Sequence, residues 1–244
     1  MSEGTDNALL ERFEQEIWSK VPHLEEGSET KVVNATPLVD MTADFKECAK
    51  SVFKLDLDNA DLKVFGKMDS TLLTGSIKVR PAANIIHDAI VTGKLRSGQT
   101  VIEATSGNFG IALGLLSKLE LNVIALVSRK LQEGVFEELR NVNIRTMDLD
   151  MDICPAPGME GKQDLLVAKA SAANIRSQLS NLGFDTDIFD KAGSEIESLL
   201  ASQDIINLAK FLAKIYGFFC PEQYDNQLNI DAHRTVTAAE IDQQ

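Results

Sequence analysis

The chain has few of the residues that would indicate a disulfide framework or a metal site. Its three cysteines are widely spaced and include no CxxC pair: Cys48, Cys154 and Cys220. This pattern favours neither disulfide bonds nor zinc. The three histidines are also far apart and show no metal-ligand spacing. A reducing compartment is therefore the expectation.

Positive charge is scarce, and so are long apolar segments. The 24 basic residues are outnumbered by 37 acidic ones, giving a net charge of −13. Nucleic acid and anionic membranes both require a basic face, so neither is expected as a partner. No apolar run is long enough to span a bilayer, and the acidic N-terminus does not resemble a signal peptide. We expect a cytoplasmic protein.

What the chain does contain is typical of a globular protein with a sizeable core. Hydrophobic residues make up 44% and charged residues 25% of its 244 residues. Residues 1–30 form a polar, acidic extension in which apolar side chains recur at helical spacing. We expect one amphipathic helix there, packed on its own chain or on another subunit.

Strands and helices are predicted to alternate from about residue 62 onward. The predicted strands cover 62–66, 100–103, 122–127 and 144–149. The predicted helices cover 81–93, 108–119, 135–140, 163–180, 194–216 and 232–241. A loop is expected at 154–161, and a turn around Gly183 with an acidic stretch at 185–190 separates the helices at 163–180 and 194–216. This alternation predicts an α/β fold, with parallel sheets covered by helices on both faces.

A lysine stands between a strand and a helix in the segment Thr74–Arg80. Gly75 permits an unusual backbone angle, and Ser76 can cap the helix that follows. Arg80 places a second cation two residues after Lys78. A lysine held in such a turn is a candidate for covalent catalysis through its amine. The alternative is an ordinary solvated surface lysine.

A second motif lies between the strand at 100–103 and the next helix. It combines hydroxyls, glycines and an amide: Thr105, Ser106, Gly107, Asn108, Phe109 and Gly110. A helix N-terminus presents unpaired N–H groups and a partial positive charge, which favour an anion such as a carboxylate. The alternative is a simple strand-to-helix turn capped by Ser or Asn.

These motifs belong to an ordered series along residues 34–241. The other members are Thr36-Pro37-Leu38, Lys67-Met68-Asp69, and the segment from Gln223 to Asn229 followed by His233, Thr237 and Glu240-Ile241. In order and spacing the series resembles the cysteine synthase and cystathionine β-synthase family of fold-type II pyridoxal-phosphate enzymes. The resemblance implies the tryptophan-synthase-β-like fold and pyridoxal 5'-phosphate as cofactor.

Site roles follow from the resemblance, residue by residue. Lys78 would form the Schiff base with the cofactor, and Asn108 would hydrogen-bond the cofactor's ring oxygen. The carboxylate of a small amino-acid substrate would be bound by Thr105, Ser106, Gly107, Phe109 and Gln223. The implied reaction is β-elimination from an activated serine, followed by addition of sulfide or a thiol.

The resemblance also divides the chain and leaves part of the family pattern unmatched. Residues 31–244 would comprise a small domain at about 45–155 and an incomplete large domain. The family's phosphate-binding GxGGT loop has no counterpart, since no Gly-Gly or Gly-x-Gly occurs in the sequence. Two alternatives stay open. One is an active enzyme, either a homodimer, or one completed by a complementing chain, or a fragment of a longer product. The other is a non-catalytic relative that acts by binding a protein.

Overall fold

A computed structural model describes residues 6–105, 107–128, 132–149 and 165–244, without the side chains of 165–167. Three features discussed above lie outside the described residues: Ser106, Cys154 and the predicted loop at 154–161. Within the described residues, no helix has the length and apolarity needed to cross a membrane.

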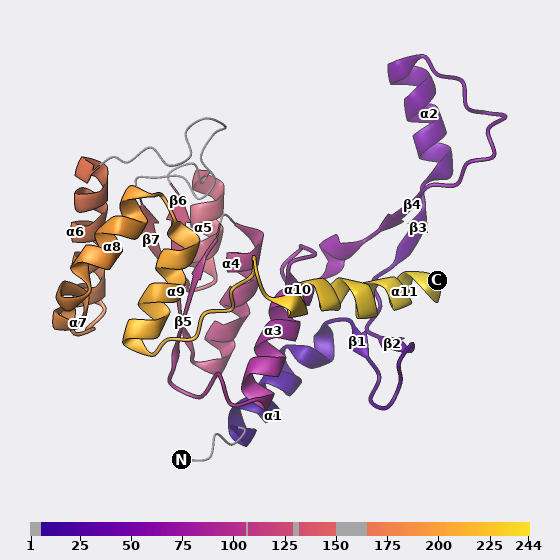
Figure 1. Cartoon of the computed structure of the whole chain (residues 1–244). Helices are drawn as coiled ribbons and strands as arrows, with labels where there is room; N and C mark the ends of the chain where they lie inside the picture. Colours follow the sequence, from indigo (N-terminus) through magenta and orange to yellow (C-terminus); the bar gives the residue numbers. More distant parts are fainter. Residues whose placement is uncertain (1–5, 106, 129–131, 150–164) are drawn as a thin grey trace.

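A parallel sheet forms the centre of the body (Figure 1). Its strands lie in the order β5-β6-β7: β5 (Thr100–Ala104), β6 (Asn122–Ser128) and β7 (Arg145–Leu149). Val101 pairs with Val123, and Ile124 pairs with Arg145. Phe219 adds a parallel bridge to Val101 on the free side of β5, which brings a segment over a hundred residues away to the sheet edge.

Helices cover both faces of this sheet (Figure 1). One face carries α1 (Asn7–Glu16), α3 (Val79–Val91), α4 (Asn108–Leu113) with the 3₁₀ turn Gly114–Leu119, and α5 (Glu133–Asn141). The other carries α6 (Leu165–Asn181), α7 (Thr186–Lys191), α8 (Gly193–Ala201) and α9 (Ile205–Tyr216). The predicted α/β class is confirmed, and α1 packs on its own chain, which was one of the two alternatives given for it.

Two hydrophobic cores follow from the side-chain alternation of the strands. Val101 and Val123 point into the core under α1, α3 and α4. Their neighbours Ile102 and Ile124 point into the core under α6, α8 and α9. Since strands buried on both faces need apolar residues at every position, the continuous apolar run of β6 is explained.

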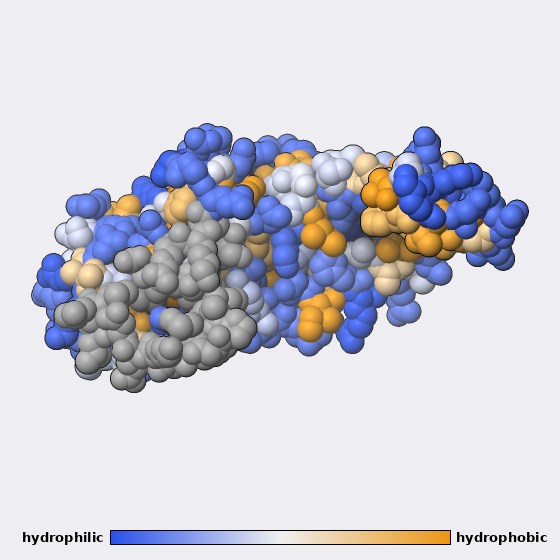
Figure 2. Space-filling model, turned by 90° about the horizontal axis from the view of Figure 1, so that it is seen from above, coloured by the Kyte–Doolittle hydropathy of each residue, from blue (hydrophilic) through white to orange (hydrophobic). Residues whose placement is uncertain are grey.

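An arm projects from the body and carries exposed apolar side chains (Figure 1). It consists of the antiparallel strands β3 (Leu38–Asp40) and β4 (Phe65–Lys67) and of α2 (Thr42–Phe53). Helix α2 was not predicted. Figure 2 shows apolar residues gathered at this end of the molecule. The exposed ones are Val39, Met41, Phe45, Val52, Phe53, Leu55 and Phe65.

Two helical predictions require correction. The predicted helix at 194–216 is broken into α8 and α9, because Asp204 accepts a bond from Asn207 N and caps a new helix. The turn around Gly183 is present, but the acidic stretch at 185–190, which was expected between helices, contains the short helix α7, capped by Asp185. Short polar residues that cap helices are also frequent in turns, so the sequence alone did not distinguish a helix start from a turn at these positions.

The C-terminal segment returns to the base of the arm (Figure 1). It comprises α10 (Gln227–Asp231), a π-helical turn (Ala232–Thr237) and α11 (Ala238–Asp242). The small strands β1 (His23–Leu24) and β2 (Val32–Val33) pair nearby, and Gln243 accepts a bond from Val32 N. The helix predicted at 232–241 is therefore present and continues α10.

Candidate active site

Lys78 lies at the start of α3, after a tight turn. Gly75 has φ +65°, a conformation that glycine adopts without strain. The Ser76 hydroxyl accepts a hydrogen bond from Lys78 N at 3.2 Å, but Lys78 is itself the N-cap residue of α3 and no side chain caps this helix, so the predicted capping by Ser76 is wrong. The half-buried Lys78 amine has neither a hydrogen bond nor an ion pair with any described residue. It is therefore available to another group.

Arg80 has a different role from the one the sequence suggested. Its side chain is 2% exposed and is bonded to Asp69 and Glu240, not to Lys78. Desolvation opposes the charge, but the hydrogen bonds that Arg80 donates to Asp69 and Glu240 raise its pKa above the usual value. Arg80 is thus a buried structural cation, which a lone arginine in a sequence does not reveal.

The loop after β5 is shaped by Thr105 and two glycines. Thr105 is 1% exposed, and its hydroxyl oxygen accepts bonds from Gly107 N at 3.4 Å and Gly110 N at 3.1 Å. Gly107 has φ +151°, which side-chain-bearing residues rarely adopt. A Cβ at Gly110 would lie 2.7 Å from the Thr105 methyl group. The glycines are therefore required by the turn itself.

The next residues point in opposite directions from this loop. Asn108 is exposed at the first position of α4, where its amide can reach an external group. Phe109 is 2% exposed and packs into the core under α1 and α3. A ligand at the loop could therefore contact Phe109 through its backbone N–H but not through its side chain.

Gln223 lies beside the loop, as the motif order suggested. Its side-chain amide donates to the Ala104 carbonyl oxygen at 2.8 Å, and its backbone N–H donates to Glu103 at 3.1 Å. Gln223 is buried and belongs to the segment that Phe219 attaches to β5. The fold thus brings together the loop and Gln223 from distant parts of the sequence.

Glu103 is a buried carboxylate that the sequence analysis did not single out. It is 2% exposed and accepts bonds from Ala104 N at 3.0 Å and from Gln223 N. Burial raises the pKa of Glu103 to about 7, although these N–H bonds oppose the shift. The available signal was an acidic residue inside the otherwise uncharged strand Thr100–Ala104.

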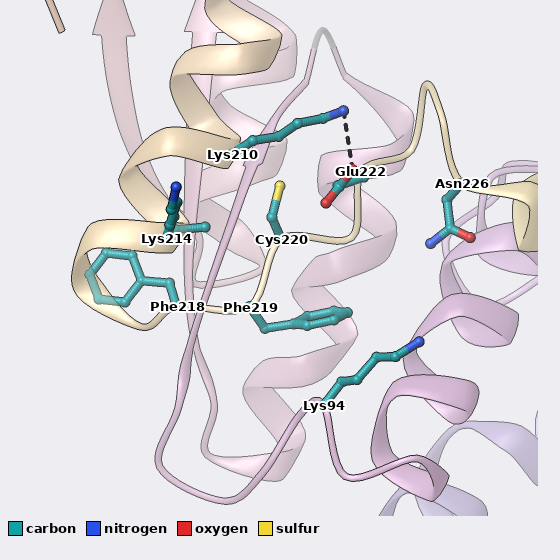
Figure 3. A pocket seen from close by; sticks show the side chains of 9 residues that line it. Lys94, Lys210, Lys214, Phe218, Phe219, Cys220, Glu222 and Asn226 are labelled. Atoms are coloured by element: carbon teal, nitrogen blue, oxygen red, sulfur yellow. Dashed lines mark ion pairs between the residues drawn. The ribbon is translucent and has the colours of Figure 1, made fainter. Parts of the chain in front are cut away.

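A cavity of about 520 Å³ lies elsewhere, beside α9 and the segment 218–226 (Figure 3). Lys94, Lys210 and Lys214 line it, and Lys210 pairs with Glu222 at 3.1 Å. Glu222 adjoins Gln223, but the cavity includes none of the site residues named above. Side-chain chemistry, not cavity size, identifies the candidate site. No group of metal ligands occurs among the described residues.

Comparisons with known proteins agree on one family. A family model described as pyridoxal-phosphate dependent enzyme matches residues 36–244. Cysteine synthase from Aquifex aeolicus is 38% identical over 86 residues, which is 35% of this chain and 24% of the relative. Cysteine synthase from Staphylococcus aureus is 25% identical over 216 residues, covering 88% of this chain and 51% of the relative.

Solved structures show the same fold. O-ureido-L-serine synthase aligns with a TM-score of 0.51 at 23% identity, over 84% of this chain and 46% of that chain. A hydrogen sulfide-producing enzyme from Fusobacterium nucleatum aligns with a TM-score of 0.51 at 19% identity, over 86% and 52%. The chain therefore spans about half the length of these structures and at most about half of the two curated relatives.

Proposed function

The chain belongs to the pyridoxal-phosphate-dependent enzyme family, and we propose that Lys78 carries the cofactor while the loop from Thr105 to Gly110 binds the substrate carboxylate. The observation that carries the proposal is the Lys78 amine, half-buried in a structured turn and without a partner among the described residues.

The residues around Lys78 fit an aldehyde-bearing aromatic group. Thr74, four residues before Lys78, has a buried hydroxyl with no hydrogen-bond partner. An unsatisfied buried hydroxyl is costly unless a ligand or water completes its bonds. Asn108 offers an exposed amide at the neighbouring loop. Lys78 would hold the aldehyde carbon, and Thr74 and Asn108 would supply hydrogen bonds to the ring.

The reaction we propose is β-elimination and replacement on an activated serine-type amino acid, with sulfide or a thiol as acceptor. It is supported by the family match and by the relatives named cysteine synthase. Pyridoxal phosphate, when bound, would stabilise negative charge at the substrate α-carbon, so that the α-proton can be removed and the β-substituent can leave afterwards. Once the substrate amine has replaced it on the cofactor, the free Lys78 amine would be the base that takes the α-proton.

The loop residues would orient the substrate. The backbone N–H of Phe109, in the first turn of α4, would donate to the substrate carboxylate, and we propose that Ser106 and Gly107 belong to the same site. Thr105 and Gln223 act on the loop through the hydrogen bonds described above, and we propose that they also complete the carboxylate site.

A second function, binding of a partner protein, is favoured by the arm. Seven exposed apolar residues lie on β3, β4, α2 and the residues that adjoin them. Contiguous exposed apolar surface commonly marks an interaction site. The arm could also bind a partner in a catalytic assembly. Cofactor binding, and not the arm, therefore distinguishes a catalytic from a purely protein-binding function.

Cofactor titration tests the proposed function. Pyridoxal phosphate added to the purified chain should produce the visible absorbance of a lysine-bound cofactor, and adding O-acetyl-L-serine should change that band. Lys78→Ala should abolish the band, whereas Lys118→Ala, which removes an exposed lysine of another element, should retain it. A band of equal strength in Lys78→Ala would contradict the assignment.

A further inference from the structure

A buried charge cluster includes Arg80, two residues after Lys78. Glu240 of α11 is 0% exposed and contacts Arg80 at 2.6 Å and Lys67 at 2.7 Å. Arg80 in turn bonds both oxygens of Asp69, at 3.0 and 2.7 Å. Two cations are thus balanced by two carboxylates. Although burial opposes ionisation, the bonds from Arg80 keep the pKa of Glu240 below its usual value.

This cluster holds both ends of the segment that contains Lys78. Asp69 begins the 3₁₀ turn before the segment, and Arg80 lies in the first turn of α3 after it. The start of α3 has no side-chain cap, so its position depends on these bonds. Thr36 adds a further link, since its hydroxyl donates to Asp69 at 2.9 Å.

The same C-terminal segment is attached to the substrate loop at its other end. Gln223 is bonded to Glu103 and to Ala104, as described above. Asn229 donates to the Gln223 carbonyl oxygen at 2.8 Å, and Asn84 of α3 donates to the Leu228 carbonyl oxygen at 2.9 Å. Residues 223–240 therefore connect the loop at Thr105 with the turn at Lys78.

We propose that Glu240 is a positioning residue for Lys78, and that residues 223–240 fix the spacing between the Lys78 amine and the substrate loop. The inference rests on the proposed function. It assigns Glu240 no contact with cofactor or substrate, because its carboxylate already forms ion pairs with Arg80 and Lys67 and accepts a hydrogen bond from Thr36. Its effect is transmitted through Arg80.

A purely stabilising role is the competing explanation. Buried ion pairs often contribute little net stability, because desolvation offsets the attraction between the charges. A cluster of this kind is better explained by a requirement for geometry, since its bonds have fixed directions. If the cluster only stabilises the fold, any variant with a similar loss of stability should bind the cofactor equally well. If the cluster positions Lys78, a variant within the cluster should bind the cofactor more weakly than such a control.

The test compares Glu240→Gln with Leu179→Ala, a core variant on the opposite face of the sheet. Both variants are expected to lower the melting temperature. We expect Glu240→Gln to weaken pyridoxal phosphate binding at least about tenfold, because small displacements of reacting groups have large effects. Leu179→Ala should bind within about twofold of wild type, since only neighbours couple strongly. Arg80→Lys keeps the charge but not the two-pronged contact with Asp69. It should therefore weaken pyridoxal phosphate binding by an amount between those of Leu179→Ala and Glu240→Gln.

Hydrogen exchange gives a readout without cofactor. In Glu240→Gln the amides of residues 74–80 should exchange about tenfold faster, whereas in Leu179→Ala they should not change. Unchanged exchange and unchanged binding in both Glu240→Gln and Arg80→Lys would overturn the proposal. If wild type binds no cofactor, the proposed function fails, and exchange at 74–80 still decides whether Glu240 orders the Lys78 turn.

Discussion

Neutralising Glu103 should remove a specific part of the pH dependence of stability. Glu103 is 2% exposed, and its pKa is raised from 4.5 to about 7 by burial. Because the folded-state pKa is raised, this carboxyl favours the folded state most below pH 4.5. The contribution is lost as the pH rises towards 7. The shift corresponds to about 3 kcal/mol in the free energy of unfolding.

The substitution Glu103→Gln preserves the shape and eliminates the titration. One of its two terminal atoms can no longer accept the N–H bond from Ala104 or Gln223, which costs about 1 kcal/mol at every pH. Relative to wild type, the variant should therefore be less stable by about 1 kcal/mol at pH 4 and more stable by about 2 kcal/mol at pH 8.

Urea unfolding at a series of pH values measures this difference. Far-UV circular dichroism is the suitable signal. Trp18 stacks on His87 with ring centroids 4.4 Å apart, so its fluorescence would also change with the protonation of that histidine. Glu137→Gln, at an exposed position of α5, is the matched control and should keep the wild-type dependence. A difference between Glu103→Gln and wild type that stays constant from pH 4 to pH 8 would refute the reasoning.

Two further predictions concern the loop glycines. Gly107→Ala should lower the free energy of unfolding by about 1–3 kcal/mol, because φ +151° is strained for alanine; the same urea series measures it, and an unchanged midpoint would contradict it. Gly110→Ala should cost about 1–3 kcal/mol through the 2.7 Å approach to the Thr105 methyl group. Adding Thr105→Ser removes that methyl while keeping the hydroxyl, so the double variant should regain stability relative to Gly110→Ala.

Much of the fold could be predicted, since local patterns determine it. The apolar run of β6 and the Pro-to-Gly span of α3 are signals carried by neighbouring residues, and both elements were found. Helix α2 was not found: it buries only Ala49, so its pattern lacks the usual apolar face directed at a core.

The candidate site was predictable only where motifs are contiguous. Lys78 and the loop at Thr105 were identified from short segments of sequence, and their assigned roles remain predictions. Glu103 was not identified and Glu240 was noted only as part of a motif without a role, because their importance depends on burial and on partners 120 and 160 residues away. Tertiary structure alone brings such partners together.

Attachment of the cofactor is the central claim, and borohydride reduction measures it most directly. Reduction of the chain incubated with pyridoxal phosphate converts a cofactor-bound lysine into a stable adduct that peptide mass spectrometry can locate. The account predicts that the adduct lies predominantly on the peptide containing Lys78. An adduct spread evenly over exposed lysines such as Lys118 and Lys94, with none enriched at Lys78, would contradict it.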